Sequence, residues 1–442
     1  MKRKETSIKK NMFMNALLQG SSILFPLIVF PYVSRVLMPE GIGKVNFALS
    51  LVSYFAMVAQ LGIPTYGVVA CARVRDDREK LSKIVQELLI INCVTCLIVY
   101  AMMGICIAMV PAMQRDAPMY LMLSVTILLN ALGVEWLYQA IEKYSYITKR
   151  SLIFKTVALI MTFLLIKKPD DCMMYGFVSV FAVSASNILN FINLRKHVTF
   201  KKTGEYHFRN HMSAMLTFFL ISVSISIYTN LDSVMLGFMK GDAEVGYYTV
   251  AVKVKLALVS FLIAINGVLL PRFSYYLESG ARDRMNSILR KTTKVMLGIS
   301  VPLAILFMIF AREVVMILAG SDFEPAVPAM IAIMPTLVVI GISSLYGNQV
   351  LVPMGQEKTV AISAAVGAVT NLIINAILIL PYGAAGASVS TLIAEVMVLI
   401  FILSKVDRDV LKAGFRNLGL SKIVLFNLML LAAGLVFKKF GV

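Results

Sequence analysis

The 442-residue chain is poor in charge, because Asp, Glu, Lys and Arg make up only 15% of it, against about 25% in a typical soluble domain. It has one Trp, three His and five Cys. The cysteines lie mainly in apolar stretches, so we expect packed thiols rather than a disulfide framework. These scarcities exclude the soluble globular, disordered and disulfide-rich classes.

Hydrophobic residues are correspondingly abundant, at 59% of the chain, and the mean hydropathy is +0.82. A membrane-spanning helix needs about 20 mostly apolar residues, and the sequence predicts an all-α membrane protein with about twelve such helices. The fifth is short. A last apolar stretch, 423 to 437, fits a membrane-surface helix or a compressed thirteenth span equally well. The twelve predicted spans are 11–36, 45–64, 84–110, 118–141, 151–166, 172–194, 212–237, 247–271, 295–318, 326–351, 359–380 and 382–404.

The positive charges predict the orientation, since Lys and Arg near span ends are retained in the cytoplasm. With a cytoplasmic N-terminus, the inner segments hold 30 of the 42 Lys and Arg residues and the outer segments hold nine. The net charge of +18 then reflects topology and contact with anionic membrane lipids. No loop is long enough for a basic nucleic-acid-binding domain, so nucleic acid is not an expected partner.

The inner connection 195–211 divides the spans six and six, and the halves share a weak sequence echo. The pair Val36-Leu37 resembles Met235-Leu236 at an offset of 199 residues. The later match of Gly43 and Ala48 to Gly246 and Ala251 has an offset of 203 residues. We predict two pseudo-symmetric six-helix lobes, 1–210 and 211–404, around a central cavity. A basic cytoplasmic segment with a short apolar helix, 405–442, would follow them.

Two lysines lie within the eighth span, where ionisable groups face a cavity or a partner by default. Lys253 continues a stripe of small and polar residues spaced by three or four, which predicts a cavity-facing position. Lys255 is about 200 degrees away on the helix, among apolar residues, and is expected to snorkel. The stripe consists of Gly246, Thr249, Lys253, Ala257 and Ser260.

Polar side chains also mark other spans. The first carries Asn15 and Gln19 on one face, followed by Pro26 and Pro31, which favour a bendable helix. The eleventh places Asn371 and Asn375 one turn apart. Such a pair either lines a cavity or bridges helices, and the sequence leaves both open for these two asparagines.

Glu135 and Lys155 lie at similar depth near the inner ends of two consecutive spans, so we expect a structural ion pair between them. No metal site or cofactor is expected. His207 and His211 have helical spacing, but without an acid or third ligand nearby they are interpreted as part of a solvated loop. No nucleotide-binding motif is visible, so uphill movement would need an ion gradient or consumption of the cargo.

Seven ordered motifs resemble the bacterial oligosaccharide flippase family of the multidrug, oligosaccharidyl-lipid and polysaccharide exporter superfamily. They extend to about residue 405. Departures include Met38, where the family often has Gly, and Val68 and Val69, where a basic residue often occurs. The motifs are Pro31–Gly43, Leu61–Gly67 with Arg73–Asp77, Glu135–Glu142, Asn230–Gly237, Val245–Lys253, Gly347–Gly355 and Gly383–Ala387.

The resemblance implies a bacterial plasma-membrane transporter, not an enzyme, that moves polyprenyl-pyrophosphate-linked oligosaccharide from the inner to the outer leaflet by alternating access. The polysaccharide polymerase machinery would be a further partner. Residue roles follow as hypotheses: a pyrophosphate and sugar site built from Arg35, Lys253, Asn15, Gln19, Asn371 and Asn375, and ion coupling by Asp232 and Glu395.

Two other functions remain open from the sequence. A multidrug and toxin cation antiporter of the same superfamily would use a cavity lined by acids, and Asp232, Glu135 and Glu395 are nearly as numerous as the intramembrane bases. A membrane-embedded enzyme or a passive assembly partner is less favoured, because the acids are dispersed and the loops are short.

Overall fold

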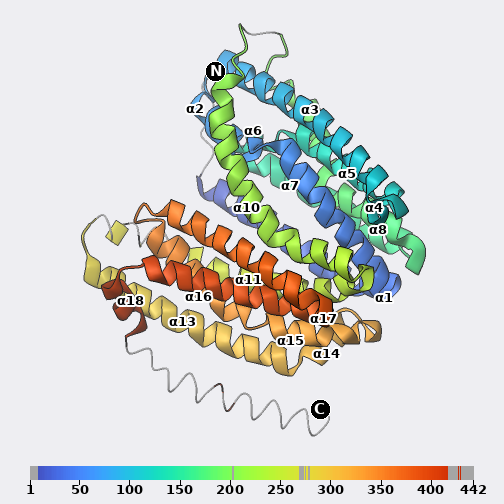
Figure 1. Cartoon of the computed structure of the whole chain (residues 1–442). Helices are drawn as coiled ribbons and strands as arrows, with labels where there is room; N and C mark the ends of the chain where they lie inside the picture. Colours follow the sequence, from blue (N-terminus) through green and yellow to red (C-terminus); the bar gives the residue numbers. More distant parts are fainter. Residues whose placement is uncertain are drawn as a thin grey trace. The chain divides into compact units, whose positions relative to one another are not determined.

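The computed structural model describes residues 8–201, 204–267, 273, 275–276, 279–416, 427 and 429, and all regular structure among them is helical (Figure 1). Except for residues 427 and 429, the apolar stretch 423–437 lies outside the described residues. The helices are α1 (Ile8–Gln60), α2 (Ile63–Arg73), α3 (Arg78–Met109), α4 (Pro111–Arg115), α5 (Ala117–Gly133), α6 (Glu135–Ala140), α7 (Tyr144–Leu165), η1 (Pro169–Asp171), α8 (Cys172–Val180), η2 (Phe181–Ala185), α9 (Asn187–Leu194), α10 (Arg209–Met239), α11 (Asp242–Gly267), α13 (Arg282–Ile309), α14 (Ala311–Leu318), η3 (Ser321–Ala326), α15 (Val327–Ile333), α16 (Thr336–Tyr346), η4 (Gly347–Leu351), α17 (Glu357–Lys405) and α18 (Arg408–Phe415).

The described residues contain seven helical runs that are long and apolar enough to cross a membrane, or up to nine if each of two bent helix pairs forms one span. The runs Lys10–Arg73, Ala117–Ala140 and Glu357–Lys405 each contain a break in the helical backbone. The protein is therefore an all-α, multi-pass membrane protein. The number of twelve crossings stays a prediction.

Helix α3 shows the inside-out polarity that a lipid environment permits. Its buried side includes the polar residues Gln86, Glu87 and Asn92. Leu97 and Ile105, on its outer side, are 71% and 58% exposed. Hydrocarbon cannot satisfy a polar group, so polar side chains turn toward the protein and apolar ones toward lipid.

The chain forms two compact units. Unit 1 contains residues Met1–Leu37 and Lys44–Asn230, and unit 2 contains Met38–Gly43 and Leu231–Val442. The start of α10 belongs to unit 1, where the backbone of Met215 and Phe219 packs closely against Gly62. The two predicted six-helix lobes, 1–210 and 211–404, stay a prediction.

Helix α1 runs without interruption through Pro26 and Pro31 and breaks at Met38, whose φ of 61° and ψ of 176° are not helical. The non-helical residue thus lies beyond the two prolines that favour a bendable helix. The break coincides with the point at which the chain passes from unit 1 into unit 2.

Helix α17 is two helical segments that meet at Gly383, which has a positive φ of 52°. A Cβ on Gly386 would overlap the backbone of Leu378. In a straight helix these residues would be roughly 12 Å apart along the axis. The second segment therefore folds back on the first, and residues equally far from Gly383 on the two segments lie at similar depth.

Candidate functional site

The carboxylate of Asp232, on α10, is the centre of a buried polar cluster in unit 2. Its Oδ1 accepts hydrogen bonds from Nδ2 of Asn371 at 3.0 Å and Nδ2 of Asn375 at 2.6 Å. Its Oδ2 accepts one from the hydroxyl of Tyr248, and Oγ1 of Thr391 lies 2.9 Å away. Asp232 is only 5% exposed, so a carboxylate has been taken out of solvent and surrounded by donors.

The reversal of α17 at Gly383 assembles this cluster. Asn375 lies eight residues before Gly383 and Thr391 lies eight residues after it, so both side chains reach Asp232 from antiparallel segments. Asn371 is one turn from Asn375 and donates to the same carboxylate oxygen. Helix α11 adds Tyr248 from a second direction.

All four neighbouring groups can donate to the carboxylate of Asp232, which accepts through both of its oxygens. One acceptor is left over: Oδ1 of Asn375 is buried without a hydrogen-bond partner in the described part of the chain. A negative charge with amide and hydroxyl oxygens beside it has the donor set of a small monovalent cation site. A proton on the carboxylate would use the same group.

The other predicted polar residues of unit 2 lie on α11 and α17. Glu395 is buried and lies one turn beyond Thr391. Lys253 and Lys255 are half-buried. Lys253 is five residues from Tyr248, about 140 degrees round the helix, and so projects from a different side of α11 than the Asp232 cluster.

In unit 1, three of the predicted substrate residues lie on α1. Asn15, Gln19 and Arg35 are exposed. The Nη1 of Arg35 donates to the carbonyl of Pro31, 2.6 Å away on the same helix. Because Arg35 belongs to unit 1 and Lys253 to unit 2, joint binding of one cargo by these residues stays a prediction.

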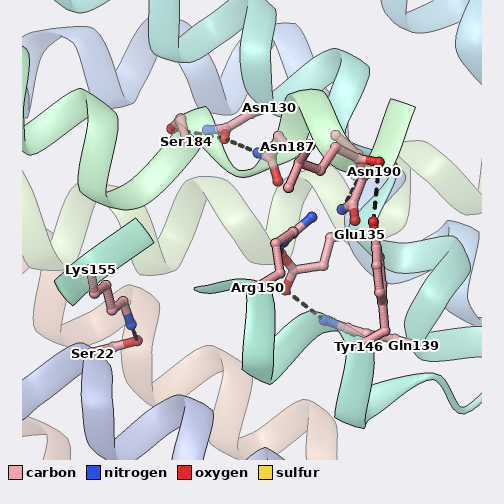
Figure 2. Close-up of polar contacts among 12 residues, drawn as sticks. Ser22, Asn130, Glu135, Gln139, Tyr146, Arg150, Lys155, Ser184, Asn187 and Asn190 are labelled. Atoms are coloured by element: carbon pink, nitrogen blue, oxygen red, sulfur yellow. Dashed lines mark hydrogen bonds and ion pairs between the residues drawn. The ribbon is translucent and has the colours of Figure 1, made fainter. Parts of the chain in front are cut away.

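Glu135 and Lys155, which the sequence paired with each other, have different partners in the structure. The Oε2 of Glu135 binds Nη2 of Arg150 at 3.2 Å. The Nζ of Lys155 donates to Oγ of Ser21 at 2.9 Å and of Ser22 at 2.8 Å, apart from the Glu135 group (Figure 2). Helix α7 starts at Tyr144 rather than 151, which places Arg150 inside the helix, opposite Glu135.

Arg150 is a residue that the sequence analysis missed. Its side chain is only 4% exposed, although it was assigned to an inner loop next to the short fifth span. The available signal was Glu135, an acid within a span that requires a basic partner.

A network of amides lies near this pair in unit 1 (Figure 2). Oδ1 of Asn130 accepts from Ser184 and from Asn187, at 3.2 and 3.1 Å. Nδ2 of Asn190 donates to the carbonyl of Gly133 at 2.6 Å. These bonds tie the α5–α6 break to η2 and α9, so they hold the helix that carries Glu135.

The sequence analysis expected His211 to lie in a solvated loop, but the structure places it in helix α10. It is 7% exposed, and its ring nitrogens lie 2.6 Å from the hydroxyl of Tyr66 and 2.8 Å from Oε2 of Glu87. The acid comes from α3, far away in sequence. This contact fixes the start of α10 against unit 1.

Comparison with known proteins identifies the family. The model of the family described as "Polysaccharide biosynthesis protein" matches residues 8–277, more than half of the chain, and the MatE model matches residues 218–377. The chain therefore belongs to the polysaccharide biosynthesis protein family. This agrees with the resemblance seen in the sequence motifs.

Individual relatives cover nearly the whole chain. A protein of Shigella dysenteriae, named as a candidate O-antigen transporter, is 26% identical over 404 residues, which are 90% of this chain and 100% of the relative. The solved structure of the lipid II flippase MurJ, in an inward closed conformation, has a TM-score of 0.74 at 15% identity and covers 97% of this chain and 99% of its own. A multidrug resistance MATE family transporter in an inward-facing conformation has a TM-score of 0.61 at 14% identity, covering 93% and 94%. These structures share the fold.

Proposed function

We propose that the protein is a flippase that carries polyprenyl-pyrophosphate-linked oligosaccharide from the inner to the outer leaflet of a bacterial plasma membrane. Its N-terminus would be cytoplasmic. The support is that a relative named for O-antigen transport aligns along 90% of the chain, and that a lipid II flippase has the same fold. Membrane lipids are the natural surroundings of such a cargo, and the polymerase machinery would receive it.

We further propose that Asp232 couples transport to an ion gradient during alternating access. The observation that carries this proposal is the buried carboxylate surrounded by donors, with Oδ1 of Asn375 left as an open acceptor. Asn371 and Asn375, first considered for sugar binding, are better assigned to this ion site because both donate to Asp232. Glu395, one turn from Thr391, remains a second candidate for coupling.

Cargo recognition is assigned to cations and polar side chains elsewhere. Arg35 and Lys253 would attract the pyrophosphate through charge-assisted hydrogen bonds. Asn15 and Gln19, exposed on α1, offer amides to sugar hydroxyl groups.

Reconstituted vesicles test the coupling directly. A fluorescent lipid-linked oligosaccharide is placed in one leaflet, and its translocation is followed with and without a sodium or proton gradient. We expect a gradient to speed translocation by wild-type protein, and D232N to lose that stimulation while still binding cargo. The matched control is D322N, an exposed acid in η3. Undiminished stimulation in D232N would contradict the coupling role, and no translocation by wild type would contradict the flippase function.

The MatE family match over residues 218–377 supports a second candidate, a multidrug cation antiporter. Such a protein would protect cells that lack their own exporters against cationic drugs. Protection without any translocation of the glycan lipid would favour this alternative.

A further inference from the structure

Lys155 carries a buried positive charge halfway along a membrane helix. It lies 11 residues after the start of α7 and 10 before its end, so roughly 15 Å of helix extends on either side. The side chain is buried, with the whole residue 9% exposed. A cation at this depth is costly unless an anion or a water-filled space compensates it.

The nearby acid, Glu135, does not form a contact ion pair with Lys155. Both oxygens of Glu135 are occupied, Oε2 by Arg150 at 3.2 Å and Oε1 by Nε2 of Gln139 at 3.4 Å. Among the ion pairs of the described chain, none within 4 Å joins Lys155 to a carboxylate. Within the described residues, Lys155 therefore has serine hydroxyl groups rather than a carboxylate at contact distance.

Ser21 and Ser22 hold the ammonium group in place without neutralising it. Each hydroxyl lies within reach of the Leu18 carbonyl, at 2.7 and 3.1 Å, and can donate its proton there. Their lone pairs then accept from Lys155. An ammonium group has three N–H donors, so one remains for a ligand. Ser22, whose contact with Lys155 is drawn in Figure 2, is exposed, so the polar groups beside the ammonium group reach the surface of unit 1.

We propose that Lys155, positioned by Ser21 and Ser22, binds a phosphate oxygen of the lipid-linked cargo. This site rests on the proposed flippase function and adds to it a cargo contact in unit 1. A phosphate oxyanion supplies the missing negative charge and accepts the free N–H, and the serine hydroxyls extend the polar surface beside it. Ordinary anionic lipid headgroups share this chemistry and are distinguished by the test.

The test measures binding of farnesyl pyrophosphate, a short polyprenyl pyrophosphate, to the purified full chain in detergent by calorimetry. We expect K155Q to weaken binding about tenfold or more, because one charge-assisted hydrogen bond is lost. The uncharged analogue farnesol should bind wild type and K155Q alike. K255Q is the matched control, since Lys255 is another intramembrane lysine, half-buried on α11 in unit 2.

Each outcome has a defined meaning. Wild-type affinity in K155Q, or equal losses in K155Q and K255Q, would overturn the Lys155 site while leaving the flippase function intact. A lower melting temperature with unchanged affinity would reduce Lys155 to a structural link between α1 and α7. Equal, Lys155-dependent binding of phosphatidylglycerol would assign the site to membrane lipid instead. Failure of wild type to bind farnesyl pyrophosphate would count against the proposed function itself.

If K155Q does not fold, S22A provides the second measurement. Ser22 is exposed and its loss leaves Ser21 in place, so the fold should tolerate the change. We expect a few-fold loss of farnesyl pyrophosphate affinity with unchanged farnesol binding. An unchanged pyrophosphate affinity in S22A would overturn the proposed site.

Discussion

The positive charge of Arg150 is balanced by one acidic neighbour, Glu135. Its Nη2 binds Glu135, while its Nε and Nη1 are buried without hydrogen-bond partners in the described part of unit 1. Removing the acid would leave a guanidinium group that is 4% exposed and has no counter-ion. Glu135 itself is 38% exposed, but the cation that it compensates is buried, and leaving a buried charge without its partner is more destabilising than losing an exposed pair.

We therefore expect E135A to lower the free energy of unfolding by about 3 kcal/mol. The matched control is E142A, because Glu142 pairs with Arg75 where both side chains are about 40% exposed. That change should cost less than about 1 kcal/mol. Denaturation of both variants in detergent measures the difference, and similar losses in the two would contradict the structural role of the Arg150 contact.

At the residue scale, the sequence predicted the local spacing of side chains better than it predicted their partners. The helical spacing of Asn371 and Asn375 correctly predicted a shared face, because that spacing is local. The contact between this face and Asp232 is tertiary structure that depends on the reversal of α17, so the local spacing could not predict it. The predicted pair of Glu135 and Lys155 is replaced for the same reason: only the packing of the described helices shows that Glu135 faces Arg150 and that Lys155 faces two serines.

The helical backbone breaks within two long helices, at Met38 in α1 and at Gly383 in α17. The two residues differ in how easily they adopt a non-helical conformation. Gly383 has no Cβ, and the amide of the next residue, Ala384, donates to Oε2 of Glu244 at 2.7 Å, so the new helical segment begins with a capping acid. Met38 adopts φ 61° and ψ 176°, a backbone region that is essentially restricted to glycine. The break in α1 is therefore strained.

Replacing Met38 with Gly should relieve this strain. We expect M38G to raise the free energy of unfolding by about 1 kcal/mol, after the greater freedom of Gly in the unfolded chain is subtracted. The control M102G, at a half-exposed position inside α3, should lower it by about 1 kcal/mol, since Gly is unfavourable within a helix. Thermal melting in detergent compares them, and a loss of stability in M38G would argue against the strained backbone.

Element positions were predictable where hydropathy alone sets them, and less so where a charge is buried. Helix α3 contains the whole predicted span 84–110 except its last residue, because its apolar side faces outward along its length. Helix α7 begins seven residues before the predicted span 151–166, because hydropathy drops at Lys149 and Arg150 while the helix continues. The contact with Glu135 that permits this is invisible in a hydropathy pattern.

At the scale of the whole molecule, the two chain halves meet in a reciprocal contact within unit 2. A Cβ on Gly43 would overlap the carbonyl of Asp242, and a Cβ on Gly246 would overlap the carbonyl of Pro39. Gly43 and Gly246 are 203 residues apart, and so are Pro39 and Asp242. This is the offset of the later part of the weak sequence echo, from Gly43 to Ala48. Such exchange of equivalent partners is what a two-fold axis produces, and it supports the proposal that the chain is a duplication.

Both glycines are needed because the backbones approach too closely for a side chain. We expect G43A and G246A each to lower the free energy of unfolding by about 1–3 kcal/mol, the usual cost of overpacking. G20A and G104A are matched controls, since a Cβ at either helical position meets nothing within 4 Å. They should be neutral or slightly stabilising.

Because the two glycines share one contact, the double variant G43A/G246A should cost less than the sum of its single changes: once the backbones have been pushed apart, the second methyl group finds space. Denaturation of the four proteins of this cycle in detergent gives the interaction energy. Fully additive losses would mean that the glycines act independently. If both single substitutions leave stability unchanged, the backbones do not approach closely at these glycines. The structural support for a duplicated chain would then be lost.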